Sequence, residues 1–382
     1  MDFESLFDIP IDDLHTPCYL TDARLLQKNT ALLKQIQQRT GCKILLAQKA
    51  FSMFSAYPLI RDDLAGTTAS GLFEAKLGRE HFGKEVHVFS PAYTQEDFTQ
   101  LLELCDHIVF NSFGQWKKYR QQVQDATRNI SCGIRINPGY AEVETDLYNP
   151  CISGSRMGVP LEQMEDDFAG LDGIHFHTMC EQNSDVLERT LDHMLPQFDK
   201  WLKRCKWVNF GGGHHITRPD YDVERLVRCI ERVRDTYGVQ VYLEPGEAVA
   251  LNAGYLVATV LDVVHNGMDI AILDASAACH MPDVLEMPYR PHILYSGTAG
   301  EKAYTYRLAG NTCLAGDVIG DYSFDHQLQA GEKLVFCDMA IYSMVKNNTF
   351  NGVPLPDIAL YQDGQIQLVK RFGYIDFEGR LS

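Results

Sequence analysis

The stretch Leu243-Glu244-Pro245-Gly246-Glu247 decides the fold of this chain once it is compared with two earlier stretches. Phe210-Gly211-Gly212-Gly213 lies about 30 residues before it, and Ala47-Gln48-Lys49-Ala50-Phe51 lies near the N-terminus. In each stretch a short apolar run ends in a charged or glycine residue. Barrels of alternating strands and helices carry their catalytic groups at the carboxyl ends of the strands. The three stretches therefore predict such a barrel, with a site at one rim.

The rest of the first two thirds of the chain fits this prediction. Short apolar runs, several rich in β-branched residues, alternate with amphipathic stretches such as Val186 to Leu202 and Val223 to Tyr237. The pattern predicts an α/β fold with a (β/α)8 TIM barrel over residues 30–252. The expected strands are Lys43 to Leu46, Gly66 to Ala69, Val86 to Phe89, His107 to Phe110, Ile134 to Ile136, Gly173 to His177, Trp207 to Phe210 and Val239 to Leu243.

After the barrel the pattern changes to strands with short turns, which predicts a C-terminal, mostly β domain over residues 253–382. Asp363-Gly364 is typical of a tight hairpin turn. Residues 1–29 form an N-terminal segment whose run Pro17 to Leu20 is expected to pair with this β domain. The expected strands are Tyr255 to Val264, Met268 to Leu273, Ala303 to Leu308, Lys333 to Cys337, Ile358 to Tyr361 and Gln365 to Val369.

The composition limits the classes of partner. A formal net charge of −17 argues against nucleic acid and anionic membranes and is compatible with a cationic substrate. Met1 to Ser5 has neither a basic nor an apolar region of the kind a signal peptide needs, and no apolar run approaches the length of a membrane span. Eleven cysteines without a disulfide framework are expected to be reduced thiols. A cytoplasmic location is therefore expected.

The three stretches supply the contacts that pyridoxal 5'-phosphate (PLP) needs in a protein: an amine for its aldehyde, N–H groups for its phosphate and an anion for its ring nitrogen. Lys49, Gly211 to Gly213 and Glu244 are the candidates, in that order. Their order and spacing resemble the fold-type III PLP enzymes, the alanine racemase and ornithine decarboxylase superfamily. A carboxylate at the ring nitrogen keeps it protonated and so favours decarboxylation. A lysine that ends an apolar strand is expected to have a lowered pKa.

The resemblance implies roles for further residues. His177 resembles the histidine that stacks on the cofactor ring. Gly310 to Asp317 resembles a motif of the basic and diamino-acid decarboxylases, in which Cys313 would come from the partner subunit of a homodimer and help protonate the carbon left by CO₂. Asp317, at the end of that motif, is implied as a substrate-binding residue. Tyr342 resembles the tyrosine beside the cofactor phosphate, and Phe350-Asn351-Gly352 matches the family's F-N-G ending.

Two departures from the family pattern narrow the substrate. Leu314 replaces the acid that contacts the distal amino group of ornithine or diaminopimelate. Glu247 replaces the arginine that usually follows Glu-Pro-Gly, which removes a partner for a distal carboxylate and favours a distal ammonium, or else a local ion pair. Both departures argue against the commonest substrates of the superfamily.

The strings Gly211 to Ile216, Glu244 to Ala248 and His280 to Glu286 resemble one subgroup, the carboxynorspermidine (carboxyspermidine) decarboxylases of polyamine biosynthesis. The resemblance implies a substrate with an α-amino acid head and a polycationic tail, and norspermidine or spermidine as product. Acidic residues are the natural acceptors for such a tail. The candidates are Glu247, Asp283 and Glu286, with Arg290 as a weaker candidate partner for the reacting carboxylate.

Several alternatives remain open at this point. The chain is also compatible with a decarboxylase of diaminopimelate, arginine or ornithine, and, in another functional class, with a non-catalytic PLP-binding or regulatory homologue. An amino-acid racemase is less favoured, because racemases of this fold carry arginine at the position of Glu244. A metal site at His214-His215 or Cys279-His280 is not expected, because no CxxC or HxxxH spacing supports one.

Overall fold

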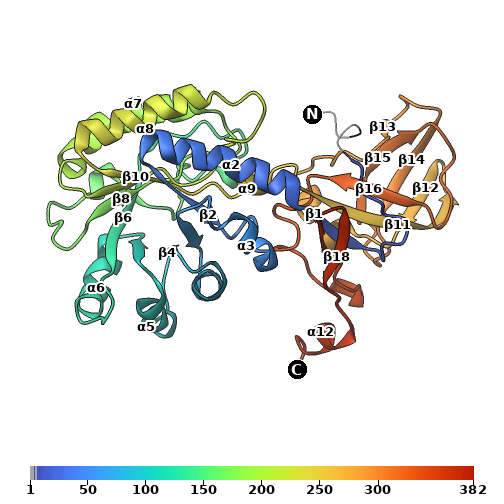
Figure 1. The fold of residues 1–382 in the computed structure, drawn as a ribbon, viewed down its shortest axis with the longest axis horizontal. Helices are drawn as coiled ribbons and strands as arrows, with labels where there is room; N and C mark the ends of the chain where they lie inside the picture. The colour runs from blue at the N-terminus through green and yellow to red at the C-terminus, as the bar shows by residue number, and fades with distance from the viewer. Residues whose placement is uncertain (1–3, 5–6) are drawn as a thin grey trace. The chain divides into compact units, whose positions relative to one another are not determined.

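The computed structural model describes Glu4 and residues 7–382. It divides into two compact units, one of Gln27–Val249 and one of Met1–Leu26 together with Ala250–Ser382 (Figure 1). Apart from Glu4, the stretch Met1 to Ser5, where no export signal is expected, lies outside the described residues. No helix among the described residues is both long and apolar enough to cross a bilayer.

The first unit contains a closed ring of parallel strands in the order β5-β4-β3-β2-β10-β9-β8-β6, with β6 pairing back to β5. The predicted TIM barrel is therefore confirmed. A short ninth strand, β7 (Val159–Pro160), pairs with β6 outside the ring. The ring strands are β2 (Lys43–Ala47), β3 (Gly66–Ala69), β4 (Glu85–Phe89), β5 (His107–Phe110), β6 (Ser131–Asn137), β8 (Gly173–His175), β9 (Trp207–Asn209) and β10 (Gln240–Leu243).

Helices alternate with these strands and begin where side chains cap them. Thr94, Ser112 and Asp222 each accept a backbone N–H in the first turn of the helix that follows. The last of these helices ends at Gly238, whose φ of 67° suits a glycine C-cap. The helices are α2 (Ala23–Thr40), α3 (Tyr57–Ile60), α4 (Leu72–Leu77), α5 (Gln95–Leu104), α6 (Phe113–Gln124), α7 (Ser184–Leu202), α8 (Val223–Tyr237) and α9 (Glu247–Ala250).

The order of the strands places the candidate residues side by side. β2, β10, β9 and β8 are consecutive neighbours in the ring and run parallel. Lys49, Glu244, Gly211 and His177 each follow one of these four strands by one or two residues. Because the strands are parallel, all four residues lie at the same rim of the barrel.

The second unit contains a mixed sheet in the order β13-β15-β14-β12-β11-β1-β17-β18, with β16 paired to β11, which confirms the predicted β domain. The N-terminal strand β1 lies between β11, which it pairs antiparallel, and β17, which it pairs parallel. Asp363 and Gly364 join β17 to β18 with φ angles of 53° and 78°, as a tight hairpin turn requires. The strands are β1 (Cys18–Asp22), β11 (Gly254–His265), β12 (Asp269–Leu273), β13 (Gly297–Thr298), β14 (Tyr304–Ala309), β15 (Val318–Phe324), β16 (Lys333–Cys337), β17 (Asp357–Gln362) and β18 (Gln365–Lys370), with helices α10 (Ala277–His280), α11 (Asp283–Glu286) and α12 (Tyr374–Glu378).

Candidate active site

Glu244 is a buried carboxylate held by two side chains of the barrel. Asn209 Nδ2 donates to Glu244 Oε1 at 2.7 Å, and His175 Nε2 lies 3.3 Å from Glu244 Oε2. Burial alone would raise the pKa of Glu244, but His175, followed by His87 and Asn209, outweighs it and lowers that pKa to about 2. The rim of the barrel therefore contains an anion at neutral pH.

The glycine run after β9 is tied to this carboxylate and to His177. The N–H of Gly211 donates to Asn209 Oδ1 at 2.9 Å, and the N–H of Glu244 donates to the Gly211 carbonyl at 2.8 Å. The N–H of Gly212 donates to His177 Nδ1 at 2.7 Å. Of the three predicted phosphate donors, the Gly213 N–H alone has no acceptor among the described residues, so it is the one left for an anion.

Close packing explains why these positions are glycine. A Cβ at Gly212 would lie 2.7 Å from the Glu244 carbonyl oxygen, and one at Gly213 would lie 2.0 Å from the Met179 carbonyl oxygen. Gly211 and Gly213 also adopt positive φ angles of 69° and 82°. Any side chain would therefore push the loop away from Glu244 and His177.

Lys49 and His177 line the same small cavity as Glu244. The Lys49 side chain is exposed, through the cavity that it lines, and its pKa is lowered by the protein atoms packed around it and by Arg135. Burial, with Lys49 and Arg135 nearby, also lowers the pKa of the half-buried His177. The lowered pKa leaves a larger fraction of the Lys49 amine unprotonated at neutral pH, and the unprotonated amine is the nucleophile.

Arg135 is a residue of this cavity that the sequence reasoning missed. It lies inside β6, its guanidinium carbon is 4.6 Å from the centre of the Phe89 ring, and its Nη2 donates to the His177 carbonyl at 3.3 Å. Its Nε has no partner among the described residues, and burial lowers its pKa to about 10. The signal was present, because a charged residue inside the apolar run of Ile134 to Ile136 is costly to bury without a purpose.

Glu247 and His215 form an ion pair beside the glycine loop. His215 Nε2 lies 3.1 Å from a Glu247 carboxylate oxygen. Burial would lower the pKa of His215, but the Glu247 carboxylate outweighs it and raises that pKa above the ordinary value. The local ion pair is thus formed, and contact of Glu247 with a substrate stays a prediction.

The predicted cysteine loop lies in the second unit. Cys313 and Leu314 are exposed, and the N–H of Cys313 donates to Asn351 Oδ1 at 2.7 Å, which ties the cysteine motif to the F-N-G ending. Asp317 is buried, and its carboxylate accepts hydrogen bonds from Ser276 Oγ at 2.8 Å and Thr312 Oγ1 at 2.7 Å. Those bonds give Asp317 a role in holding the loop, and its substrate contact stays a prediction.

The remaining candidates also lie in the second unit. Lys346 Nζ donates to Asp283 Oδ1 and, at 2.9 Å, to Glu286 Oε2. Arg290 is exposed and donates to the Tyr289 carbonyl at 2.9 Å. Tyr342 is half-buried with a φ of 47°, a backbone conformation that non-glycine residues seldom adopt. The roles proposed for these residues in binding substrate and phosphate stay predictions.

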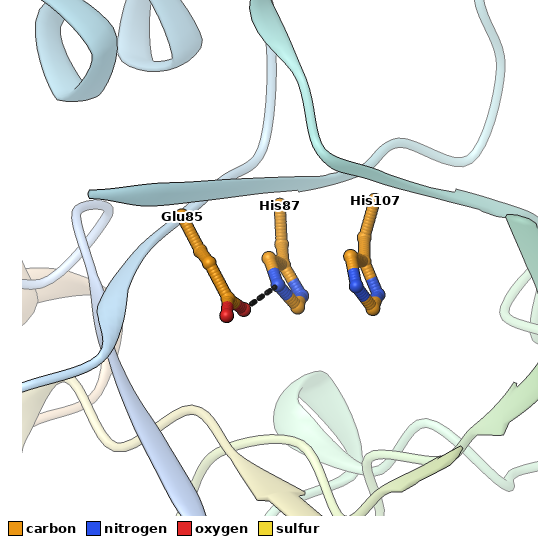
Figure 2. Close-up of side chains that lie close together, drawn as sticks. All are labelled: Glu85, His87 and His107. Carbon is orange, nitrogen blue, oxygen red and sulfur yellow. Dashed lines mark hydrogen bonds and ion pairs between the residues drawn. The ribbon is translucent and has the colours of Figure 1, made fainter. Parts of the chain in front are cut away.

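A second polar cluster lies inside the barrel, formed by Glu85 and His87 of β4 and His107 of β5 (Figure 2). The two imidazoles stack with centroids 3.9 Å apart and planes 9° from parallel. Ring-nitrogen lone pairs lie in the ring planes, so stacked rings do not point at a common ion. Glu85 already accepts from the Lys43 ammonium. The geometry and the nearby cation therefore disfavour a metal here.

The rim of the barrel fits PLP. Lys49 supplies an amine, Glu244 a buried anion, and the backbone after β9 a surface that no Cβ obstructs. The unpartnered Nε of Arg135 and Nδ1 of His175 are buried polar atoms that a polar ligand in this cavity would be able to satisfy. An amine, an anion and unpartnered polar atoms in one cavity are what the aldehyde, the ring nitrogen and the polar groups of the cofactor need.

Comparisons with known proteins agree with this fit. Residues 18–340 match the family model described as pyridoxal-dependent decarboxylase, C-terminal sheet domain. The chain is 42% identical to the carboxynorspermidine/carboxyspermidine decarboxylase of Campylobacter jejuni, over 97% of this chain and 99% of that protein. It is 41% identical to the carboxyaminopropylagmatine decarboxylase of Synechocystis, over 97% of this chain and 96% of that protein.

A solved structure is similar over the same length. The crystal structure of carboxynorspermidine decarboxylase from Campylobacter jejuni, complexed with norspermidine, superposes with a TM-score of 0.89 at 41% identity. The match covers 96% of this chain and 100% of that chain. The similarity therefore extends over both units.

Proposed function

Because this chain belongs to the pyridoxal-dependent decarboxylases and, within them, to the carboxynorspermidine/carboxyspermidine decarboxylase family, we propose that it decarboxylates carboxynorspermidine and carboxyspermidine in polyamine biosynthesis. Similarity over nearly the whole length of both units is the observation that carries the proposal. The family and the PLP cofactor expected from the sequence are confirmed.

Each candidate residue of the barrel would contact a different part of the cofactor. Lys49 would bind the aldehyde, Glu244 the ring nitrogen, and the loop at Gly213 the phosphate, with His177 against the ring. Bound PLP supplies an electron sink for the bond that breaks when CO₂ leaves. The low pKa of Glu244 keeps this residue an anion over the physiological range, so it would hold a proton on the ring nitrogen of bound PLP.

The substrate tail would be recognised by acids and not by cations. Leu314 offers no charge to a short distal amine, and Glu247 is a carboxylate at the position where the resemblance to ornithine and diaminopimelate decarboxylases implies an arginine. Asp283 and Glu286 already bind one alkylammonium, that of Lys346. A substrate ammonium that reaches this pair would have to replace Lys346, because both carboxylates are otherwise neutralised.

Carboxyaminopropylagmatine is a second candidate substrate, favoured by the relative from Synechocystis. A name ending in agmatine denotes a guanidinium end in place of an ammonium end. A guanidinium forms paired, planar hydrogen bonds with a carboxylate, whereas an ammonium donates from a point. The two substrates therefore place different geometric demands on the same acids.

A substrate panel tests the proposal. The purified, PLP-loaded protein is incubated separately with carboxynorspermidine, carboxyspermidine, carboxyaminopropylagmatine, diaminopimelate, ornithine and arginine, and both CO₂ and the amine product are measured. Norspermidine and spermidine as the main products support the proposal. A main product from carboxyaminopropylagmatine supports the second candidate. Release only from diaminopimelate, ornithine or arginine refutes both, and no release with bound PLP favours a non-catalytic homologue.

We also propose that the enzyme is a cytoplasmic homodimer. The exposed Cys313 belongs to a motif whose cysteine acts in the partner's site in the family it resembles, so its Sγ would give a proton to the substrate Cα across the interface. All eleven cysteines are free thiols, as a reducing compartment favours. Light scattering tests the assembly, and a fully active monomer would refute it.

A further inference from the structure

Asn209 is a fully buried polar residue at the end of β9 that neither the motifs nor the proposed reaction assigns a role. Its side-chain amide uses both ends. Nδ2 donates to Glu244 Oε1 at 2.7 Å, and Oδ1 accepts the N–H of Gly211 at 2.9 Å. If the amide were flipped, its NH₂ would face the Gly211 N–H and its oxygen would face the Glu244 carboxylate. Both contacts would be repulsive, so the neighbours permit only one orientation.

The same two partners are also joined through their backbones. The N–H of Glu244 donates to the carbonyl of Gly211 at 2.8 Å. Asn209, Gly211 and Glu244 therefore form a closed loop of hydrogen bonds between neighbouring strands β9 and β10. A shift of the glycine loop would pull on the amide, and the amide would pull on the carboxylate.

A carboxylate without a donor in a buried cavity takes up a proton more readily, because burial disfavours its charged form. His175 offers Glu244 a contact of 3.3 Å, longer than that of Asn209. Asn209 thus makes the shorter of the two contacts with the Glu244 carboxylate. Its amide is neutral across the physiological pH range. Its donation does not depend on a protonation state, unlike that of His175.

We propose that Asn209 is a positioning residue that keeps Glu244 ionised and aimed, and that couples the glycine loop to the ring-nitrogen end of the cofactor site. It acts through Glu244 and not on the substrate. The inference holds for any substrate of the enzyme, so its failure is distinct from failure of the proposed specificity.

The test compares Asn209→Leu with Asn209→Asp. Leucine removes both hydrogen bonds. Aspartate has nearly the same shape and can still accept from Gly211, but when ionised it repels Glu244 instead of donating to it. Gln37→Leu is the matched control, because its amide also joins two backbone groups, the Asp63 carbonyl and the Ile44 N–H, and touches no residue of the site.

Two readouts avoid turnover altogether. The dissociation constant for PLP should rise roughly 10-fold to 100-fold in Asn209→Leu, as loss of a hydrogen bond to a charged group implies. The ¹⁵N chemical shift of the ring nitrogen of bound, ¹⁵N-labelled PLP should move toward its unprotonated value. Both changes should shrink in Asn209→Asp as the pH falls, because a protonated aspartate can donate to Glu244 again. The control should show neither change.

An unchanged ¹⁵N shift in a folded Asn209→Leu would overturn the proposal, as would an Asn209→Asp defect that is the same at every pH. If Asn209→Leu does not fold, Asn209→Asp decides alone. An unfolded Asn209→Asp would also overturn the proposal, because it would show that the residue serves the fold and not the site.

Discussion

His177 Nδ1 accepts the N–H of Gly212 at 2.7 Å, so the ring expected to stack on the cofactor is also a support of the glycine loop. A ring nitrogen that accepts a hydrogen bond carries no proton, which leaves the proton of the neutral ring on Nε2. The lowered pKa of His177 agrees with a neutral ring. His177 therefore supports the glycine loop, and if it stacks on the cofactor as expected, one residue would serve both purposes.

This double role predicts different losses for two variants. His177→Leu should lower the free energy of unfolding of the PLP-free protein by about 1–3 kcal/mol, because it leaves the Gly212 N–H without its acceptor. His177→Asn should lose less, because its side-chain oxygen can accept that bond. Urea unfolding measures both. Equal losses would mean that the hydrogen bond contributes little to the loop.

The histidines inside the barrel predict sensitivity to acid. The pKa of His107 is lowered to about 2 by burial and by His87. The unfolded chain binds a proton near pH 6.5 at this residue and the folded chain does not. Its contribution to stability is therefore complete above pH 6.5 and is lost as the pH falls below that value, by at most about 1.4 kcal/mol per pH unit.

Urea unfolding at several pH values between 7 and 5 measures this slope, over the pH range where the unfolded histidine titrates. His107→Phe should reduce the slope, because phenylalanine keeps an aromatic ring against His87 and Trp207 without a titratable group. His265→Asn is the control, since His265 is exposed. A slope unchanged by His107→Phe would show that His107 binds a proton as readily in the folded chain as in the unfolded chain.

The charge at Glu247 predicts a change in specificity. Glu247→Arg restores the cation of the other decarboxylases and breaks the ion pair with His215. It should lower kcat/KM for carboxynorspermidine at least about tenfold, mostly through KM, because a cationic tail would meet a cation. Glu188→Arg is the control: it makes the same change of charge and also breaks an ion pair, with Arg225, at a residue of α7 that does not line the cavity, and it should have little effect. A Glu247→Arg variant with unchanged KM would separate Glu247 from the substrate.

Strand periodicity and the spacing of motifs predicted the barrel because most ring strands contain a short apolar run, such as those in β2 and β5, that ends near a polar or glycine residue. β15 was missed because Gly320, Asp321 and Ser323 interrupt its apolar pattern. In the structure it is paired on both sides, with β13 and with β14. Strands of two residues, such as β7, carry no periodicity at all. Such strands form because neighbouring strands pair with them, and the residue pattern of a single strand does not reveal those neighbours.

Candidate residues of the cofactor site could be predicted from the sequence where a side chain of one chemical type is needed at a strand end. Lys49 and Glu244 are examples, since an amine and an anion at strand ends stand out, and the structure places both in one cavity. Their contacts with the cofactor stay predictions. Asn209 was missed because its role is visible only through its partners, Glu244 and Gly211. Arg135 was overlooked although its charge inside an apolar run was a signal, and its contacts with Phe89 and His177 show where it lies. Likewise, the bond between Cys313 and Asn351 joins motifs that are separate in sequence.

Mixing two inactive variants tests the shared site. If Lys49 of one protomer works with Cys313 of its partner, Lys49→Ala and Cys313→Ala homodimers have no complete site. A mixed dimer has one complete site of two, so an equal mixture after subunit exchange should recover about a quarter of the wild-type sites. Recovery no greater than the sum of the separate variants, with exchange verified by mass, would place both residues in one subunit's site or remove Cys313 from the reaction.

The most direct test of the central claim, that this is a carboxy-polyamine decarboxylase, is a competition between carboxynorspermidine and diaminopimelate at equal concentration. In one vessel, the ratio of the products norspermidine and lysine equals the ratio of the two kcat/KM values when little substrate is consumed. We predict that norspermidine exceeds lysine by at least about 100-fold. Lysine formed in equal or greater amount would contradict the assignment of substrate while leaving the cofactor site intact.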